Sequence, residues 1–285
     1  MYRVLFFTLL LFISGCASNM VKHPAADKIN KVAIISIYSN LNIYDINKKD
    51  KSESIITLAK MASGEGKINK GNIALTSKAL GHYSSALNNS KWKVMPNSEL
   101  LTHPAYLAFI KETKGDGVMG FLKKASSASW AVPTGMVYIP YDVITNKSTK
   151  RRLGDDSHEK AKSRLAQLSK DLDVDGVAVI HMDLAYKTPM MSIAISGILT
   201  NKRNKAKPRV SSEIVIVNSD GKIALETPAV KRGKGKRYES KDNAPMLLGN
   251  YVDLSGKDGE QAIEAFSEAI KKHAKSVKSE IKKGL

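Results

Sequence analysis

The stretch LAQLSKDLDVDGVAVIHMDLAY, residues 165–186, decides the fold class. Its leucines recur every three or four residues, which predicts a helix over residues 157–172 with one apolar stripe. A polar turn at residues 173–176 leads into VAVIHMDLAY, residues 177–186, which has the composition of a buried strand. A helix that passes through a short turn into a buried strand predicts an α/β fold.

Strands and helices also follow one another on both sides of this stretch. Apolar runs predict strands at residues 31–39, 91–96, 191–199, 209–218 and 223–230. Apolar stripes predict helices at residues 54–62, 72–88 and 257–283, and another that begins at Asn97 or Ser98 and is kinked or restarted at Pro104. We therefore expect an α+β domain in which helices pack on a mixed sheet, closed by a C-terminal amphipathic helix.

Three segments are predicted to connect or extend these elements. The pair Asp220-Gly221 predicts a hairpin turn, and KRNKAK, residues 202–207, a basic loop at the tip of the preceding hairpin. Residues 114–150 predict an insertion or surface arm that ends in MVYIPYDVI, residues 136–144, an edge strand because Pro140 cannot donate to a ladder. The apolar part of that arm, residues 117–132, is either a contact surface or an ordinary buried segment.

The N-terminus has the layout of an export signal. Arg3 precedes a ten-residue apolar run, residues 4–13, which as a helix covers about 15 Å and is too short to cross a hydrocarbon core of about 30 Å. Ile13-Ser14-Gly15-Cys16 resembles the lipobox of bacterial lipoproteins. The resemblance implies cleavage between Gly15 and Cys16, with N-palmitoyl and S-diacylglycerol groups on Cys16. The alternative is a buried cysteine in an ordinary signal peptide.

Removal of residues 1–15 leaves a chain without another cysteine, so neither a disulfide nor a thiolate metal site is expected in it. Residues 16–28 are polar and aperiodic and predict a lipidated tether, and residues 29–285 predict a single periplasmic domain. Ala17 is not the aspartate that retains many enterobacterial lipoproteins on the inner membrane. That sorting rule implies the outer membrane, with the domain facing the periplasm.

The charge of the chain is strongly basic. Loss of Arg3 lowers the formal net charge from +18 to +17. Such a charge either keeps the surface hydrated or attracts an anionic envelope polymer or phospholipid. Because the chain is predicted to be exported and no nucleic-acid-binding motif is present, we expect no nucleic acid partner.

Several motifs resemble those of domains that share the fold of the TolB N-terminal domain. They are KVAIISI at residues 31–37, WKVMPNSELL at residues 92–101, the helix-to-strand passage quoted above and NSDGKIALET at residues 218–227. This group includes the curli secretion lipoprotein and the lipoprotein activators of penicillin-binding proteins. The resemblance implies an accessory role in an envelope assembly. Each motif is short and mainly apolar, and residues 114–150 have no counterpart in the family pattern.

A catalytic or cofactor-binding constellation is not evident. His181 and Asp183 alternate along one strand and share a face, which suits either acid–base catalysis or a polar strand surface. The glycine- and lysine-rich segments 64–72 and 233–237 lack the phosphate-loop pattern, and the carboxylates near residues 155–156 and 171–175 lack a calcium-loop pattern. The sequence has six histidines, none of them in a pair with metal-ligand spacing: His23, His82, His103, His158, His181 and His273. We predict no cofactor, no metal and no enzymatic activity.

The sequence thus predicts an envelope lipoprotein that acts as a non-catalytic adaptor or accessory subunit, bound to an envelope protein or to copies of itself. One alternative is a ring-forming secretion component related to the curli pore lipoprotein, in which residues 191–199 and 209–217 would cross the membrane. A second alternative is a hydrolase of envelope polymers, for which His181 and Asp183 are the candidates.

Overall fold

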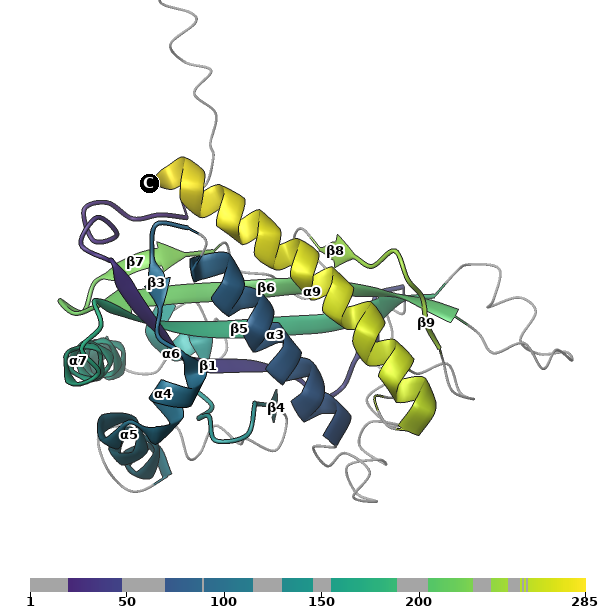
Figure 1. Cartoon of the computed structure of the whole chain (residues 1–285), viewed down its shortest axis with the longest axis horizontal. Coiled ribbons are helices and arrows are strands. Elements are labelled where there is room, and N and C mark those ends of the chain that lie inside the picture. The colour runs from purple at the N-terminus through teal and green to yellow at the C-terminus, as the bar shows by residue number, and fades with distance from the viewer. Residues whose placement is uncertain are drawn as a thin grey trace, which may run out of the picture.

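A mixed sheet runs through the part of the chain that the computed structural model describes, and helices cover both of its faces (Figure 1). The described residues are 20–47, 70–88, 90–114, 130–145, 155–188, 205–227, 237–245, 252, 254 and 256–285. Within these ranges the chain forms nine strands and six helices, and the α+β fold class predicted from the sequence is confirmed.

Five strands form the main path of the sheet, in the order β3-β1-β5-β6-β7. β1 is parallel to β3 and β5, whereas β6 is antiparallel to β5 and β7. The bounds of these strands are β1 Lys31–Asn40, β3 Lys93–Val94, β5 Gly176–Lys187, β6 Lys205–Asn218 and β7 Ile223–Glu226. Four two-residue strands add to the main path: β2 Tyr44–Asp45 on β5, β4 Trp130–Ala131 on β1, and β8 Tyr238–Glu239 and β9 Ala244–Pro245 on β6.

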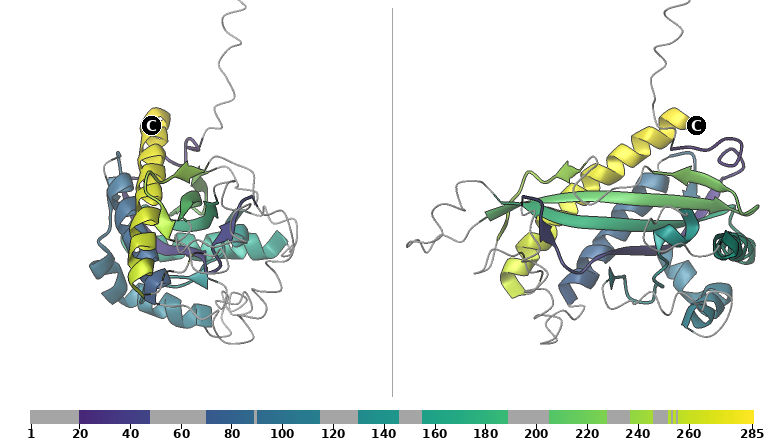
Figure 2. Two further views of the ribbon diagram at one scale, coloured as in Figure 1. Left: turned by 90° about the vertical axis from the view of Figure 1, so that its right-hand side faces the viewer. Right: turned by 180° about the vertical axis from the view of Figure 1, so that it is seen from behind.

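The helices form two outer layers (Figure 2). On one face of the sheet lie α3 Lys70–Asn88 and the long α9 Gly256–Gly284, which pack against each other. The other face is covered by α6 Tyr141–Thr145 and α7 Asp155–Asp171. Next to these lie α4 Asn97–Thr102 and α5 Pro104–Lys114, which restart at Pro104 as predicted. No described helix is both long enough and apolar enough to cross a membrane.

The passage from α7 to β5 has the structure expected from its sequence. Leu165, Leu168 and Leu172 are almost completely buried beneath α7. The turn is closed by Ser169, whose hydroxyl donates to the carbonyl of Val174 at 2.6 Å. The carboxylate of Asp175 accepts the backbone N–H groups of Asn30 and Lys31 at 2.8 and 2.9 Å, which aligns the start of β1 with the start of β5.

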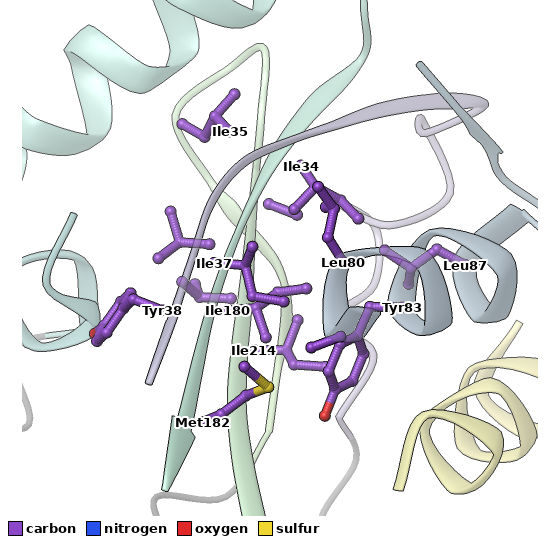
Figure 3. Packing of buried hydrophobic residues seen from close by; sticks show 14 of the residues in the cluster. Ile34, Ile35, Ile37, Tyr38, Leu80, Tyr83, Leu87, Ile180, Met182 and Ile214 are labelled. Atoms are coloured by element: carbon purple, nitrogen blue, oxygen red, sulfur yellow. The ribbon is translucent and has the colours of Figure 1, made fainter. Parts of the chain in front are cut away.

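Successive side chains of each strand point to opposite faces of the sheet, so the core has one half on each face. In Figure 3, Tyr83 of α3 approaches Ile214 and Met182 from one side of the sheet, whereas Tyr38 points to the opposite side of β1. All of these side chains are at most 2% exposed. Because both faces of β5 and β6 are covered, these strands read as nearly continuous apolar runs in the sequence.

Three segments differ from their predictions. Residues 136–144 do not form an edge strand, and α6 begins at Tyr141 instead. Side chains take the place of a ladder there: Tyr38 Oη accepts the N–H of Tyr141 at 2.8 Å, and Ser36 Oγ accepts that of Ile139 at 3.2 Å. Residues 130–145 therefore contribute to the buried core, and the rest of the predicted arm lies outside the described residues.

Residues 20–28 lie on the domain, although they were predicted to belong to the tether. Val21 is 2% exposed and bridges to Leu225 of β7, with hydrogen bonds from Lys22 N to Ala224 O and from Glu226 N to Met20 O. The segment is held by three small or β-branched apolar residues that are buried, Val21, Ala25 and Ala26, although its overall composition is polar. Residues 205–207 likewise belong to β6, and not to the predicted basic loop. The predicted elements at residues 54–62 and 191–199 lie outside the described residues.

Candidate functional site

The polar residues predicted from β5 lie on the face of the sheet that carries α6 and α7. His181 is paired across the sheet with Tyr38 of β1 and Glu213 of β6, and Asp183 is paired with Ser211 of β6. His181 and Asp183 therefore share a face as the alternation predicts. They do not bind each other, however, because each has a different partner.

His181 forms a pair with Glu213. Its Nδ1 lies 2.8 Å from Glu213 Oε2, and the two side chains are 19% and 12% exposed. The imidazole stacks on the ring of Tyr38 at 4.8 Å between centroids, and Trp130 contacts its edge at 5.1 Å. The ring is thus held in one orientation by a carboxylate and two aromatic side chains.

Asp183 forms a buried ion pair with Arg237. The guanidinium Nη2 lies 2.5 Å from Asp183 Oδ2, and the side chain of Arg237 is only 6% exposed. Tyr44 of β2 completes the cluster, since its hydroxyl donates to the same carboxylate oxygen at 2.8 Å. Burial raises the pKa of Tyr44 to about 12, with a further contribution from the charge of Asp183. Asp183 is therefore committed to two partners and is not placed to act as a general base.

A β-bulge in β1 determines which residues of that strand face this cluster. The register between β1 and β5 shifts between Ile34 and Ser36, so Ile35 is the extra residue. Ile34 and Ile37 then face α3, and Ser36 and Tyr38 face His181. Sequence reasoning missed Tyr38 because KVAIISIYS has the composition of a mostly buried strand and gives no sign of the bulge.

Glu213, Tyr44 and Arg237 were also missed. Glu213 follows two serines in a run otherwise typical of a buried strand, and a cross-strand search opposite His181 would have found it only with the register known. Arg237 is the last residue of the glycine- and lysine-rich segment at residues 233–237. Its role is that of a buried cation, and the other four residues of the segment lie outside the described part of the chain.

The opposite face of the same strands carries a second tyrosine–histidine pair. Tyr83 Oη lies 2.9 Å from His273 Nδ1 and 2.5 Å from Ser212 Oγ, which connects α3, α9 and β6. Tyr83, Ser212 and His273 are 0%, 3% and 7% exposed. Because the whole group is sealed from solvent, it links the two helices to the sheet and is not a substrate site.

The other candidate carboxylates also have separate tasks. Asp175 holds the start of β1, and Asp171 accepts from Gln167 at 2.8 Å and lies 3.8 Å from Arg164. Asp173 occupies the left-handed region at the end of the helix, with φ of 53°. Within the described ranges, no group of three or more acidic, histidine or cysteine side chains is arranged to hold a metal ion. Asp155 and Asp156 begin α7.

The remaining histidines bind unrelated partners. His23 contacts Asp27 and the carbonyl of Gly284, His82 contacts Ser267, His103 accepts from the N–H of Ala105, and His158 contacts the carbonyl of Val143. Of the segment at residues 64–72, only residues 70–72 are described, and they begin α3. Gly15 and Cys16, the predicted cleavage and lipidation residues, lie outside the described residues.

The chemistry that this arrangement permits is limited. The His181 side chain is 19% exposed, and the described hydrogen bond of its ring joins Nδ1 to Glu213. No serine hydroxyl of the described residues hydrogen-bonds to that imidazole, as a serine nucleophile would. The cluster fixes β2, β4 and the residue before β8 against the sheet.

No protein-family model matches the chain, and a search of curated proteins found no match.

Proposed function

We propose that the chain is a lipoprotein of the bacterial outer membrane, anchored through Cys16, whose periplasmic domain works by binding as an adaptor or accessory subunit of an envelope assembly. The observation that carries the proposal is the tetrad Ile13-Ser14-Gly15-Cys16, which follows the apolar run and precedes the first described residue by only four positions. Met20, four residues after Cys16, already bonds to β7 through its carbonyl. A diacylated and acylated cysteine at that position would hold the domain at the membrane surface and raise its effective concentration near membrane partners.

The polar cluster on the sheet supports a non-catalytic role. Asp183 forms an ion pair with Arg237. The carboxylate that contacts His181 is that of Glu213, on the neighbouring strand β6. The first pair connects β5 to the residue before β8, and the second connects β5 to β6. They are thus explained by the assembly of the sheet, and this is what we expect of a binding domain with a rigid scaffold.

The ring-forming alternative is less compatible with the position of its second segment. Residues 209–217 lie in β6, an inner strand, and Val210, Ile214, Val215, Ile216 and Val217 are each 0% exposed. To cross a membrane, this segment would have to leave β5 and β7 and expose the core. The first segment of that alternative, residues 191–199, lies outside the described residues.

The anchor is tested by the intact mass of the purified protein. We expect loss of residues 1–15 and a mass gain that corresponds to diacylglycerol plus one fatty acyl group on Cys16, with fractionation to the outer membrane. The matched control is Cys16→Ser, which should remain unlipidated. An unlipidated wild-type protein with its signal intact would overturn the proposal.

The adaptor role is tested by crosslinking in intact cells, followed by mass spectrometry of what is recovered. We expect a defined envelope complex from the wild-type protein and its loss from the Cys16→Ser variant at equal protein level. Recovery of only a ladder of the protein itself would favour the ring-forming alternative. Recovery of the same complex from both forms would contradict a role for the anchor.

A further inference from the structure

One end of the domain gathers the segment nearest to Cys16, β7 and the C-terminus of α9. Val21 bridges to Leu225, and His23 Nε2 lies 2.7 Å from the carbonyl of Gly284. Figures 1 and 2 show the same arrangement, with the C-terminus beside the purple segment that begins at residue 20. We call this end the anchor end, defined by residues 20–28, 219–225 and 281–285.

The anchor end carries exposed lysines that have no acidic partner. Lys22, Lys222 and Lys282 are exposed, and none of them forms an ion pair with a carboxylate of the described residues. The nearby carboxylates Asp220 and Glu280 are paired with two other lysines, Lys28 at 2.8 Å and Lys283 at 3.3 Å. A third carboxylate, that of Asp27, contacts His23 at 2.7 Å. Five lysines thus outnumber three acidic side chains, and this end has an excess of positive charge.

Lys91 belongs to the same surface. It is exposed, and it follows α3 in the turn that leads to β3. Its charge acts on His23, whose pKa is nevertheless raised by the hydrogen bond to Asp27 and by the carbonyl of Gly284. We call the four unpaired residues Lys22, Lys91, Lys222 and Lys282 the anchor-end lysines.

Chain length limits how far this surface can lie from the membrane. Met20 is the fourth residue after Cys16, so the chain between these two residues spans at most about 14 Å when fully extended. A lysine side chain extends several ångströms from the backbone, and charges interact over a screening length of about 8 to 10 Å at physiological salt. A lipid-anchored domain therefore keeps its anchor end within electrostatic range of the headgroups.

We propose that the anchor-end lysines contact anionic phospholipid headgroups and so fix the orientation of the domain on its membrane. This inference rests on the proposed lipid anchor at Cys16. It goes beyond that anchor because a lipid on a single residue gives attachment without orientation. A basic surface beside the attachment point supplies the second contact. The opposite end, where α9 begins, would then point away from the membrane.

The test is amine-reactive footprinting of the full-length mature lipoprotein, read residue by residue with mass spectrometry. The protein is placed in non-ionic detergent, in phosphatidylcholine vesicles, or in vesicles with about one-third phosphatidylglycerol. We expect modification of the anchor-end lysines to slow several-fold in the anionic vesicles. Lys241 and Lys257 serve as internal controls, because both are exposed and Lys257 lies about 38 Å along α9 from Lys282.

A matched pair of variants completes the test. Lys222→Gln/Lys282→Gln and Lys241→Gln/Lys257→Gln remove the same charge, and only the first should abolish the slowing at Lys22 and Lys91. If the anchor-end lysines of a lipidated protein were slowed no more by anionic vesicles than Lys241 and Lys257 are, the inference would be overturned and the anchor would stand. A mass spectrum without lipid on Cys16 would overturn both the anchor and the inference.

Discussion

Neighbouring residues of β6 enter two different environments. Ser212 points to the α3–α9 side and joins Tyr83 and His273, whereas Glu213 points to the other side and joins His181, which stacks on Tyr38. Each face of one strand thus holds a tyrosine–histidine pair. On the α3–α9 side the histidine is 7% exposed, and on the other side the histidine side chain is 19% exposed.

The two faces differ in the groups that contact the histidine. On the sealed face the histidine contacts the Tyr83 hydroxyl, which also contacts the hydroxyl of Ser212. On the partly open face the histidine is paired with a carboxylate, and a second carboxylate two residues along β5 is neutralised by Arg237. Charged groups are costly to bury without a partner, so they gather where some water reaches them or where an opposite charge is fixed.

The largest effect is expected when one member of the Asp183–Arg237 pair is removed. Asp183→Asn or Arg237→Met should each lower the free energy of unfolding by about 3 kcal/mol, because the remaining group is left without its charged partner in a mostly buried site. Urea unfolding monitored by circular dichroism measures the change. The double variant Asp183→Leu/Arg237→Met should recover most of the loss.

The exposed Lys28–Asp220 pair provides the control for that measurement. Both side chains are about half exposed or more, so Lys28→Met should change the free energy of unfolding by at most about 1 kcal/mol. If Arg237→Met and Lys28→Met had equal effects, the buried pair would not stabilise the fold as the geometry indicates.

The sealed pair is expected to give the next largest effect. Tyr83→Phe removes a hydroxyl that contacts both Ser212 and His273, and should cost about 1 to 3 kcal/mol, since both groups stay buried. The double variant Tyr83→Phe/Ser212→Ala measures the coupling between the two hydroxyls. Strict additivity of the two single effects would show that this hydrogen bond does not stabilise the protein.

Much of the fold follows from local sequence signals. The α7-to-β5 passage, the restart at Pro104, the long amphipathic α9 and the turn at Asp220-Gly221 were each predicted from periodicity, proline or turn chemistry. These signals are local, because a helix stripe or a turn depends on residues that are close in the chain. They do not contain the register between strands.

The polar cluster could be predicted only in part for that reason. Alternation places His181 and Asp183 on one face, but their partners come from residues 32 and 54 positions further along the chain. The bulge at Ile35 and the hydroxyl groups that replace a ladder for residues 136–144 are likewise tertiary features. Residues 20–28 were assigned to the tether because three small or β-branched apolar residues are too few to give a periodic signal.

A smaller effect on stability is expected from Glu268 of α9, the helix that lies with α3 on one face of the sheet. Burial raises the pKa of Glu268, but hydrogen bonds from Ser240, Lys272 and the N–H of Lys241 outweigh it and lower the pKa to about 2. The contribution of this carboxylate to stability is therefore complete above about pH 4.5 and is lost as the pH falls toward 2.

Comparison of the wild-type protein with Glu268→Gln measures that contribution. The variant should be less stable by about 1 to 2 kcal/mol at pH 7, because a charged acceptor is replaced by a neutral one. The difference should shrink between pH 4.5 and pH 2. A difference that stays constant over this interval would show that the pKa of Glu268 is not depressed.

The smallest effect on stability, and the sharpest functional test, is expected at His181. His181→Phe keeps an aromatic ring on Tyr38 and removes the contact with Glu213, which has a further interaction in the structure. The free energy of unfolding should change by about 1 kcal/mol or less, whereas His273→Phe on the sealed face should cost more, since it deprives the buried Tyr83 hydroxyl of a partner. A non-catalytic adaptor that carries His181→Phe should still be recovered with its envelope complex at the wild-type level. If the variant were folded and anchored but the amount of intact envelope polymer in the cells rose, the partly exposed imidazole would be acting on a substrate, and the hydrolase interpretation would replace the adaptor.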